Sequence, residues 1–387
     1  MNRPKRRSAA ARNRQMQGKY LSWLLVGCVA LFLVLGLLTP DREFSESENR
    51  KLAQAPKFSV AALADGSYFD GLASYMADQF PGRDTWITIN LWMNRFFGQK
   101  EASGVYLCDD GYLMQAPSAP DEKNLERNLA AINACAAAHP DLHTVMTVAP
   151  NAVTIHADKL PANAPVRDQA ADLKRISDAL NGTKFVDVTT ALAAYKDDYL
   201  FYRTDHHWTS LGAYYAFAAL SNELGIQAPA LDTYTVYPVS TTFEGTLSSR
   251  SGSHGAKDQV DIYVPDTAID YYVTYVDSQK NISSMYNRDA LNQKDHYTVF
   301  FGGNYSRVDI TTTADTGRNL LLLKDSYANS FVQFLYPYFD HIIMVYPRYY
   351  YDNLENLVST QAITDVLYLY NADTFLGDSS LADVLGG

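Results

Sequence analysis

The chain opens with a long apolar segment that differs from everything after it. From Tyr20 to Leu38 only Ser22 is polar, and the length suits a helix that crosses a bilayer. Seven basic residues precede this segment and no acidic residue occurs before Asp41, which predicts a cytoplasmic N-terminus and an extracellular body. A cleaved signal peptide is the alternative. Because the segment is long for one and 37–40 lacks a small-x-small cleavage pattern, we expect an uncleaved signal anchor.

Apolar positions after the anchor follow helical and strand periods in turn. Helical spacing, broken at Pro81-Gly82, predicts two helices within 68–97, and 105–114 is typical of a β-hairpin. Further helices are expected at 123–138, 170–180, 190–195, 213–224, 328–339 and 353–359. Strands are expected at 143–148, 184–188, 319–324, 341–345 and 365–370. This alternation predicts a parallel sheet flanked by helices on both faces.

The stretch from Ala230 to Arg318 interrupts the alternation. It is rich in Tyr, Thr, Ser, Asp and Gly and has little helical signal, so we interpret it as an inserted region of β-hairpins and loops. The expected organisation is a cytoplasmic basic tail (1–19), a transmembrane signal anchor (20–38), a stalk (39–60) and an extracellular domain (61–387). That domain comprises a helical lead-in (61–140) and the β/loop insertion (230–318).

Charge excludes one class of partner. The chain of 387 residues has a net charge of −11, and without the seven basic residues of the tail it carries 25 basic and 43 acidic residues, or −18. A body this acidic does not predict nucleic-acid binding. Of the three cysteines, Cys28 lies in the anchor, whereas Cys108 and Cys135 lie in the exported body, where a disulfide is permitted but not required.

The tetrad Asp205-His206-His207-Trp208 places an acid, two imidazoles and an indole in consecutive positions, so it is the main candidate for catalytic residues. It stands just before the helix expected at 213–224, which Thr209 or Ser210 can cap. Residues i and i+2 of an extended segment point the same way, so we expect Asp205 and His207 to share a face and His206 to point elsewhere. A carboxylate beside an imidazole fixes the tautomer that a general base needs.

A second candidate is Ser326, which follows the apolar strand 319–324. Ligands of open α/β sheets gather at the carboxyl ends of strands, where Asn151, Arg348 and Asn371 are also expected. If the tetrad reaches this edge, Ser326, His207 and Asp205 form a nucleophile, a base and its orienting acid. The alternative is that Ser326 only caps the helix that follows, a role that Asp325 could share.

Other residues near this edge are candidates for substrate binding or for an oxyanion hole. They are Gly303, Asn304, Tyr327, Arg348 and Asn151. Structural alternatives exist, since 302–304 also suits a plain turn and Arg348 a surface ion pair. Adjacent Asp and His residues also occur as metal ligands in manganese phosphoesterases, but the further aspartates of those sites and the Cys/His pairs of zinc sites are missing. We therefore expect neither a metal nor another cofactor.

Several segments together resemble the DHHW family of bacterial envelope proteins. They are Thr204-Asp205-His206-His207-Trp208-Thr209, 44–50, 78–84, 104–106 and 323–328. That family is similar in turn to the SGNH-like O-acetyltransferases of alginate biosynthesis, in which an Asp-x-His motif precedes the nucleophilic serine, as Asp205-x-His207 precedes Ser326. The resemblance implies an SGNH-hydrolase-like fold and a Ser-His-Asp triad. It also implies acyl transfer to an exported polysaccharide, with a membrane-bound O-acyltransferase supplying the acyl group.

The sequence thus favours a membrane-anchored extracellular O-acyltransferase or esterase acting on an envelope or secreted polysaccharide. Whether water or a sugar accepts the acyl group is not decided by the sequence. A non-catalytic glycan-binding or assembly component of a polysaccharide system is the alternative from another class. A surface protein of sporulation or adhesion is a third.

Overall fold

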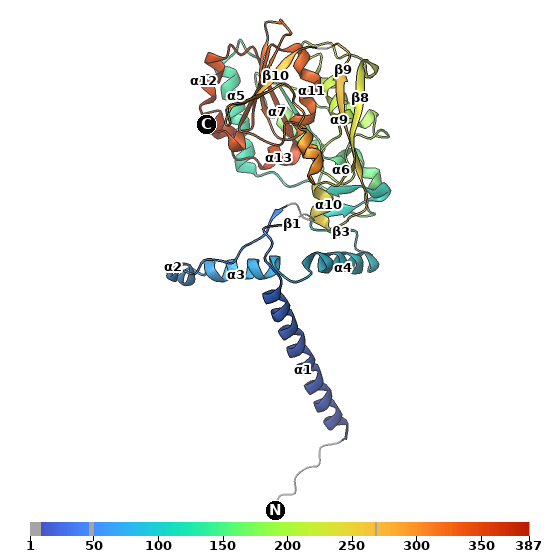
Figure 1. Cartoon of the computed structure of the whole chain (residues 1–387). Coiled ribbons are helices and arrows are strands. Elements are labelled where there is room, and N and C mark those ends of the chain that lie inside the picture. Colours follow the sequence, from blue (N-terminus) through green and yellow to red (C-terminus); the bar gives the residue numbers. More distant parts are fainter. Residues whose placement is uncertain (1–8, 46–49, 268, 387) are drawn as a thin grey trace, which may run out of the picture. The chain divides into compact units, whose positions relative to one another are not determined.

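The computed structural model describes residues 9–45, 50–267 and 269–386. The chain divides into two compact units, Met1–Met93 and Asn94–Gly387, and each is described by itself (Figure 1).

The first unit is built around the long helix α1 (Ala9–Leu38). Its part Met16–Leu38 is 23 residues long and contains an 18-residue window with a mean hydropathy of 2.6 and no buried residue, so by length and composition it could cross a membrane. The other elements of this unit are the two-stranded ladder β1 (Phe44–Ser45) and β2 (Arg50–Lys51), α2 (Val60–Ala64), α3 (Ser67–Asp78) and most of α4 (Arg83–Phe96). The break at Pro81-Gly82 separates α3 from α4, as the sequence predicts.

The second unit contains an eight-stranded sheet in the order β11-β10-β12-β14-β13-β15-β6-β7. Its strands are β6 (His143–Ala149), β7 (Lys184–Phe185), β10 (Tyr271–Tyr275), β11 (Lys280–Ile282), β12 (Arg307–Thr312), β13 (Asn319–Lys324), β14 (His341–Val345) and β15 (Asp365–Asn371). The five strands from β14 to β7 are parallel, with Leu322 of β13 level with Met344 and Leu367 of its neighbours. The carboxyl ends of these strands therefore meet at one edge.

The expectation of a parallel sheet is wrong for the other half. β11, β10, β12 and β14 pair antiparallel, and β12 joins the sheet through pairs from Arg307–Val345 to Thr311–His341. The region 230–318 is therefore only partly an insertion, because it supplies three strands of the main sheet. It also contains the helix α10 (Thr246–Ser251) and the separate ladder of β8 (Tyr234–Phe243) and β9 (Asp258–Pro265).

Helices cover both faces of the sheet, as expected. Successive side chains of β13 enter opposite cores, with Leu320 and Leu322 in one and Leu321 and Leu323 in the other. This explains why the strand reads as a continuous apolar run. The first core also contains residues of α6 (Ala152–Ile155), α8 (Thr189–Ala194), α9 (Ser210–Leu220) and α11 (Tyr327–Leu335). The second contains residues of α5 (Glu122–Ala138), α7 (Gln169–Ala179), α12 (Leu354–Thr360), α13 (Ala372–Gly377) and α14 (Leu381–Val384).

Three further details bear on the expectations. α9 begins at Ser210 rather than Ala213, because Thr209 caps it directly by accepting a hydrogen bond from the Gly212 amide (3.2 Å), and it ends at Leu220 rather than Leu224. The hairpin of β4 (Val105–Leu107) and β5 (Leu113–Gln115) forms as predicted, next to β3 (Glu101–Ala102). Cys28, Cys108 and Cys135 are all free.

Candidate active site

The loop that carries the tetrad is fixed from both ends. Phe201 and Trp208 form an isolated β-bridge across its base. The amide of Thr204 donates to a carboxylate oxygen of Asp258 (2.8 Å), and its hydroxyl donates to the same oxygen (2.5 Å). Trp208 is completely buried. Because these contacts come from distant parts of the chain, tertiary packing holds the loop in place.

Trp208 also ties the tetrad to the helix that follows Ser326. Its indole N–H donates to the carbonyl of Tyr327 (3.0 Å) and to the hydroxyl of Ser330 (3.1 Å). Both acceptors lie on α11, which begins one residue after Ser326. The indole therefore sets the position of α11 relative to the histidines.

Ser326 stands where β13 turns into α11, at the carboxyl edge of the sheet. The neighbouring Asp325 binds both sides of this turn, because its carboxylate accepts from the amides of Tyr327 (2.9 Å) and Asn371 (2.8 Å). The Ser326 side chain makes no capping hydrogen bond. Asp325 therefore caps α11, and the Ser326 hydroxyl is available for other contacts.

That hydroxyl lies beside His207. Ser326 Oγ is 2.8 Å from His207 Nε2, and His207 Nδ1 is 2.6 Å from Asp205 Oδ1. The pairs use opposite ring nitrogens, so an Nδ1–H that donates to the carboxylate leaves Nε2 to accept from the serine. Asp205 and His207 are buried, whereas Ser326 is partly exposed. The structure thus brings together the three residues to which the sequence assigned the chemistry.

Asp205 is held as an anion. Burial by itself would raise its pKa, but electrostatic interaction with the neighbouring His206 and His207 rings and hydrogen bonds from His207 and the Thr246 amide lower it far below the usual value. The amide and the hydroxyl of Thr246 both donate to Asp205 Oδ2 (2.8 Å each). Each carboxylate oxygen is therefore engaged, and the carboxylate has a fixed orientation toward the imidazole.

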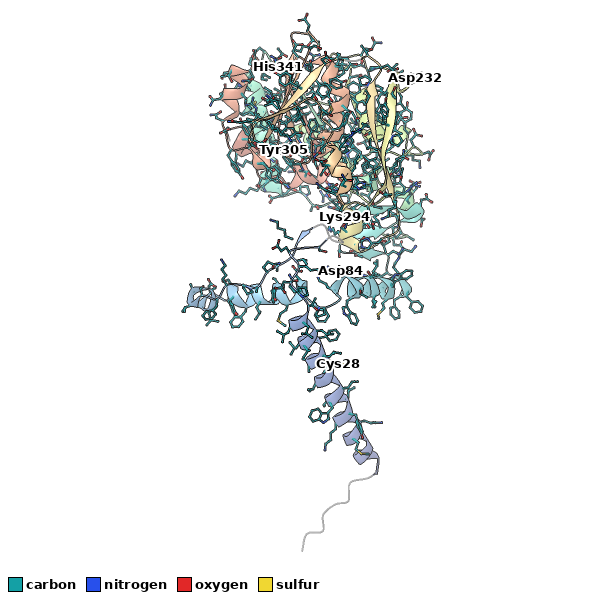
Figure 2. All side chains as sticks on the ribbon, in the orientation of Figure 1. Cys28, Asp84, Asp232, Lys294, Tyr305 and His341 are labelled. Atoms are coloured by element: carbon teal, nitrogen blue, oxygen red, sulfur yellow. The ribbon has the colours of Figure 1, made fainter. Side chains whose placement is uncertain are left out.

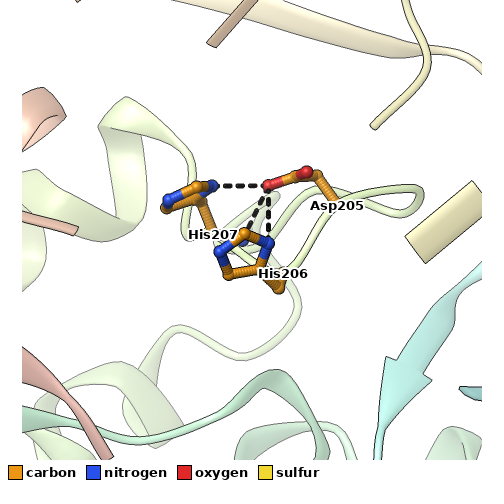
Figure 3. Close-up of side chains that lie close together, drawn as sticks. All are labelled: Asp205, His206 and His207. Carbon is orange, nitrogen blue, oxygen red and sulfur yellow. Dashed lines mark hydrogen bonds and ion pairs between the residues drawn. The ribbon is translucent and has the colours of Figure 1, made fainter. Parts of the chain in front are cut away.

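His206 does not point away from Asp205, contrary to the expectation from spacing. Its Nδ1 lies 3.6 Å from Asp205 Oδ1 (Figure 3). The same nitrogen is 2.7 Å from the hydroxyl of Thr246. The rings of His206 and His207 have centroids 3.9 Å apart. Asp205 and His207 do share a face, as expected, but His206 also faces the carboxylate because the segment is a tight bend rather than an extended strand.

This trio also satisfies the geometric condition for a metal site. One ligand atom from each of Asp205, His206 and His207 lies within 4.8 Å of the others. In both histidines, however, Nδ1 already has a protein partner: His207 Nδ1 binds the carboxylate of Asp205, and His206 Nδ1 binds the hydroxyl of Thr246. The hydrogen bonds of His207 form a continuous path from the carboxylate through the imidazole to the Ser326 hydroxyl.

Tyr297 completes the surroundings of the imidazole. Its ring stacks on His207 with centroids 3.8 Å apart and planes 13° from parallel. Its hydroxyl donates to the backbone carbonyl of Ser326 (2.9 Å). One side chain therefore contacts both the base and the backbone of the serine.

The residues assigned to substrate binding or an oxyanion hole lie in different surroundings. Tyr327 is buried, its ring packs between His207 and Trp208, and its hydroxyl donates to the carbonyl of His206. Asn151 is buried at the same edge, and its side-chain oxygen accepts from Asn371 (2.9 Å). In the part of the chain that the structure describes, no hydrogen bond joins either of them through its side chain to Ser326.

Gly303, Asn304 and Arg348 are less closely associated with the serine. The Gly303 amide points to the carbonyl of Phe300 (3.5 Å). Asn304 is exposed and accepts from Asn329 (3.1 Å), and the exposed Arg348 lies over the ring of Tyr346. Across residues 9–45, 50–267 and 269–386, no hydrogen bond joins these three to the triad.

Lys324 has a buried amine that its sequence context does not indicate. It is 3% exposed at the end of β13, where its amine donates to Asn329 and lies 5.3 Å from the ring centroid of Tyr346. Burial removes the ammonium group from water and lowers the pKa of Lys324 to about 7.

Sequence reasoning missed Thr246, Gly245 and Tyr297. All three lie in the region 230–318, which has no helical pattern to connect it with the tetrad. The only local hint is a glycine directly before Thr246. A Cβ on Gly245 would lie 2.3 Å from the Asp205 Cβ, so this glycine permits a close approach to the acid.

Comparisons with known proteins agree on a family and a fold. The model of the DHHW protein family matches residues 48–103 and 180–345, which include the tetrad and Ser326. No curated protein matches the chain.

Solved structures that are similar include a DHHW family protein from Eubacterium siraeum, with a TM-score of 0.64 and 24% identity over 74% of this chain and 96% of that one. Bacillus cereus PatB1 with a sulfonyl adduct has a TM-score of 0.61 and 19% identity, over 71% and 97%. The O-acetyltransferase domain of Pseudomonas putida AlgJ has a TM-score of 0.46 and 16% identity, over 73% and 99%. The family resemblance drawn from the tetrad is confirmed, and the chain belongs to the DHHW family.

Proposed function

We propose that this chain is an SGNH-like O-acyltransferase, with an acetyl group as the expected cargo, that acts on a polysaccharide outside the cell. The observation that carries the proposal is the continuous chain from Asp205 through His207 to the Ser326 hydroxyl, with contacts of 2.6 and 2.8 Å. This geometry suits covalent catalysis by an activated serine.

In the first half-reaction, Ser326 Oγ attacks the acyl carbonyl carbon while His207 Nε2 takes the hydroxyl proton. When the bond to the donor's leaving group breaks, His207 returns that proton to the leaving group, and the acyl group remains as an ester on Ser326. Asp205 stays ionised throughout and stabilises the imidazolium that forms. Its lowered pKa supports this role.

In the second half-reaction, His207 takes the proton of a sugar hydroxyl, whose oxygen attacks the acyl ester. The new sugar ester forms as the bond to Ser326 breaks, and the proton returns to Ser326 Oγ. Water in place of the sugar would make the same machinery an esterase. We propose that amide protons in the first turn of α11, other than that of Tyr327, which donates to Asp325, stabilise the negative charge that develops on the carbonyl oxygen.

The proposed location follows from α1. We propose that α1 anchors the chain, with the basic tail in the cytoplasm and the second unit outside, where the polysaccharide would be modified. A membrane-bound O-acyltransferase would then be the partner that brings the acyl group across the bilayer.

The test uses the full-length protein in detergent with a chromogenic acetyl ester. Ser326→Ala and His207→Ala should each lower turnover by at least about 10³-fold, as loss of one member does in other triads. His254→Ala is the matched control, because His254 also contacts a carboxylate, Glu244, but belongs to a separate cluster. Equal turnover by all four proteins would contradict the triad and favour a non-catalytic, glycan-binding role.

A second readout does not depend on the identity of the substrate. PatB1 was solved with a sulfonyl adduct, and we expect a sulfonyl fluoride to react with Ser326 Oγ here as well. Mass spectrometry should find the added sulfonyl group on the peptide that contains Ser326. The label should be absent from Ser326→Ala and should form far more slowly in His207→Ala. Labelling at the same rate in His207→Ala would show that the imidazole does not activate the serine.

A further inference from the structure

The helices α3 and α4 carry large apolar side chains that remain exposed in the described part of the chain. On α4 the large exposed residues are Trp86, Ile89, Trp92, Met93 and Phe96, and Trp92 is 67% exposed. Their spacing of three to four residues places them on one side of the helix. A helix side with five large exposed apolar residues is typical of a surface that binds a partner or a membrane.

α3 and the turn after it extend the same feature. Phe69 and Met76 of α3 are seven residues apart, so they share a side of the helix, and both are more than half exposed. Phe80, in the turn between the helices, is also exposed. Two consecutive helices therefore each present an apolar side.

Contacts within the first unit relate these helices to α1. The ring of Phe32 on α1 stacks on Phe80 with centroids 5.0 Å apart and lies 6.1 Å from Trp86. The Arg42 amide donates to the Gln79 side chain (3.0 Å), whose amide group donates back to the Arg42 carbonyl (2.9 Å). The α3–α4 turn is therefore bound to the C-terminal end of the apolar span. Figure 1 shows α3 and α4 extending crosswise from that end of α1.

The depth of these contacts matches a membrane interface. Phe32 precedes Leu38, the last residue of the span, by six residues, which corresponds to about 9 Å along a helix. Trp86, on the apolar side of α4, thus contacts a residue of α1 that lies about 9 Å below the end of the span. Amphipathic helices that lie on membranes bury their apolar side about 5–10 Å into the boundary between headgroups and acyl chains.

We propose that α3 and α4 lie flat in the interface of the phospholipid bilayer that α1 crosses, with their apolar sides among the acyl chains. Trp86 and Trp92 are of the residue type that gathers at this level. Residues 67–96 carry three acids (Asp70, Asp78, Asp84) and two bases (Arg83, Arg95), so apolar burial rather than attraction to anionic lipid drives the contact. The inference rests on the proposed anchoring by α1.

The experiment uses the full-length chain with one cysteine for an environment-sensitive fluorophore, reconstituted in phosphatidylcholine vesicles with and without brominated lipid. Cys28, Cys108 and Cys135 are changed to Ser, and a cysteine is introduced at Ile89→Cys or, as the matched control, at Thr88→Cys. Both positions are exposed, and adjacent residues lie about 100° apart around a helix. Figure 2 shows Cys28 on α1 and Asp84 at the start of α4.

We expect blue-shifted emission at position 89 and quenching by brominated lipid several-fold stronger than at position 88. A third protein that keeps only Cys28 reports on α1 and separates the two proposals. Quenching at Cys28 with equal quenching at 88 and 89 would overturn the interfacial placement and leave the anchor intact. No quenching at Cys28 would overturn the anchor as well. A blue shift at 89 without lipid quenching would mean that protein, such as a second copy of the chain, covers this side.

Discussion

Gly245 offers a direct test of how closely Asp205, the acid of the proposed triad, is positioned. Its backbone has φ −86° and ψ −166°, a conformation open to any residue, so Gly245→Ala adds a methyl group without backbone strain. That methyl carbon would lie 2.3 Å from the Asp205 Cβ and 2.5 Å from its Oδ2. Ordinary contact begins near 3.4 Å, so Asp205 and Gly245 must separate by about 1 Å.

The shift acts directly on the hydrogen bonds of Asp205. The carboxylate lies 2.6 Å from His207 Nδ1, and a displacement of about 1 Å removes good hydrogen-bond geometry there. A 1 Å misplacement of a catalytic group can cost about 10²-fold in rate, and overpacking of a filled site costs about 1–3 kcal/mol of stability. We therefore expect turnover of the acetyl ester to fall by about 10²-fold while the protein remains folded.

The assay compares steady-state turnover and urea unfolding of the wild type, Gly245→Ala and Gly377→Ala. Gly377 is the matched control, because a Cβ there meets nothing within 4 Å. Its substitution should leave turnover unchanged. If Gly245→Ala keeps wild-type turnover and wild-type stability, the close contact with Asp205 does not constrain catalysis, and the argument for a rigidly held acid fails.

Two further predictions concern buried polar groups near the serine. Lys324 has a pKa of about 7 in the folded chain and about 10.4 when unfolded, so between these values only the unfolded chain holds its proton and the free energy of unfolding should rise with pH, by up to about 1.4 kcal/mol per pH unit. The free energy of unfolding of Lys324→Met, measured in urea between pH 7 and 10, should not show this rise, whereas that of the exposed control Lys280→Met should show it. If the free energy of unfolding of Lys324→Met still rises with pH as in the wild type, the rise does not come from Lys324. Trp208→Phe removes the donor to Tyr327 and Ser330 and should lower the free energy of unfolding by about 1–3 kcal/mol. Unfolding at the wild-type urea midpoint would show that the indole N–H does not hold α11.

Much of the fold is visible in local patterns. β13 and β14 have the predicted bounds, because a short apolar run between polar residues is a strong strand signal. The antiparallel half of the sheet is not visible in this way. β10 and β11 form an ordinary hairpin, and nothing in their own sequence indicates that β12 also pairs with β14, which begins about 30 residues later.

The candidate site, like the fold, could be predicted only in part from local sequence patterns. Asp205, His207 and Ser326 could be singled out because an acid beside imidazoles and a serine after an apolar strand are uncommon local combinations. The residues that surround these three could not be predicted in this way. Thr246 and Tyr297 reach Asp205 and His207 only through the packing of a region whose side chains resemble those of any polar loop.

The order of the strands also determines when the site can exist during synthesis. β13, which leads to Ser326, lies between β14 and β15, and both of these neighbours are made after it. β15 does not begin until Asp365, so a nascent chain that already contains Asp205, His207 and Ser326 still lacks one of the two strands that flank β13. If the proposed triad is correct, a chain that ends before Asp365 should not form a reactive Ser326.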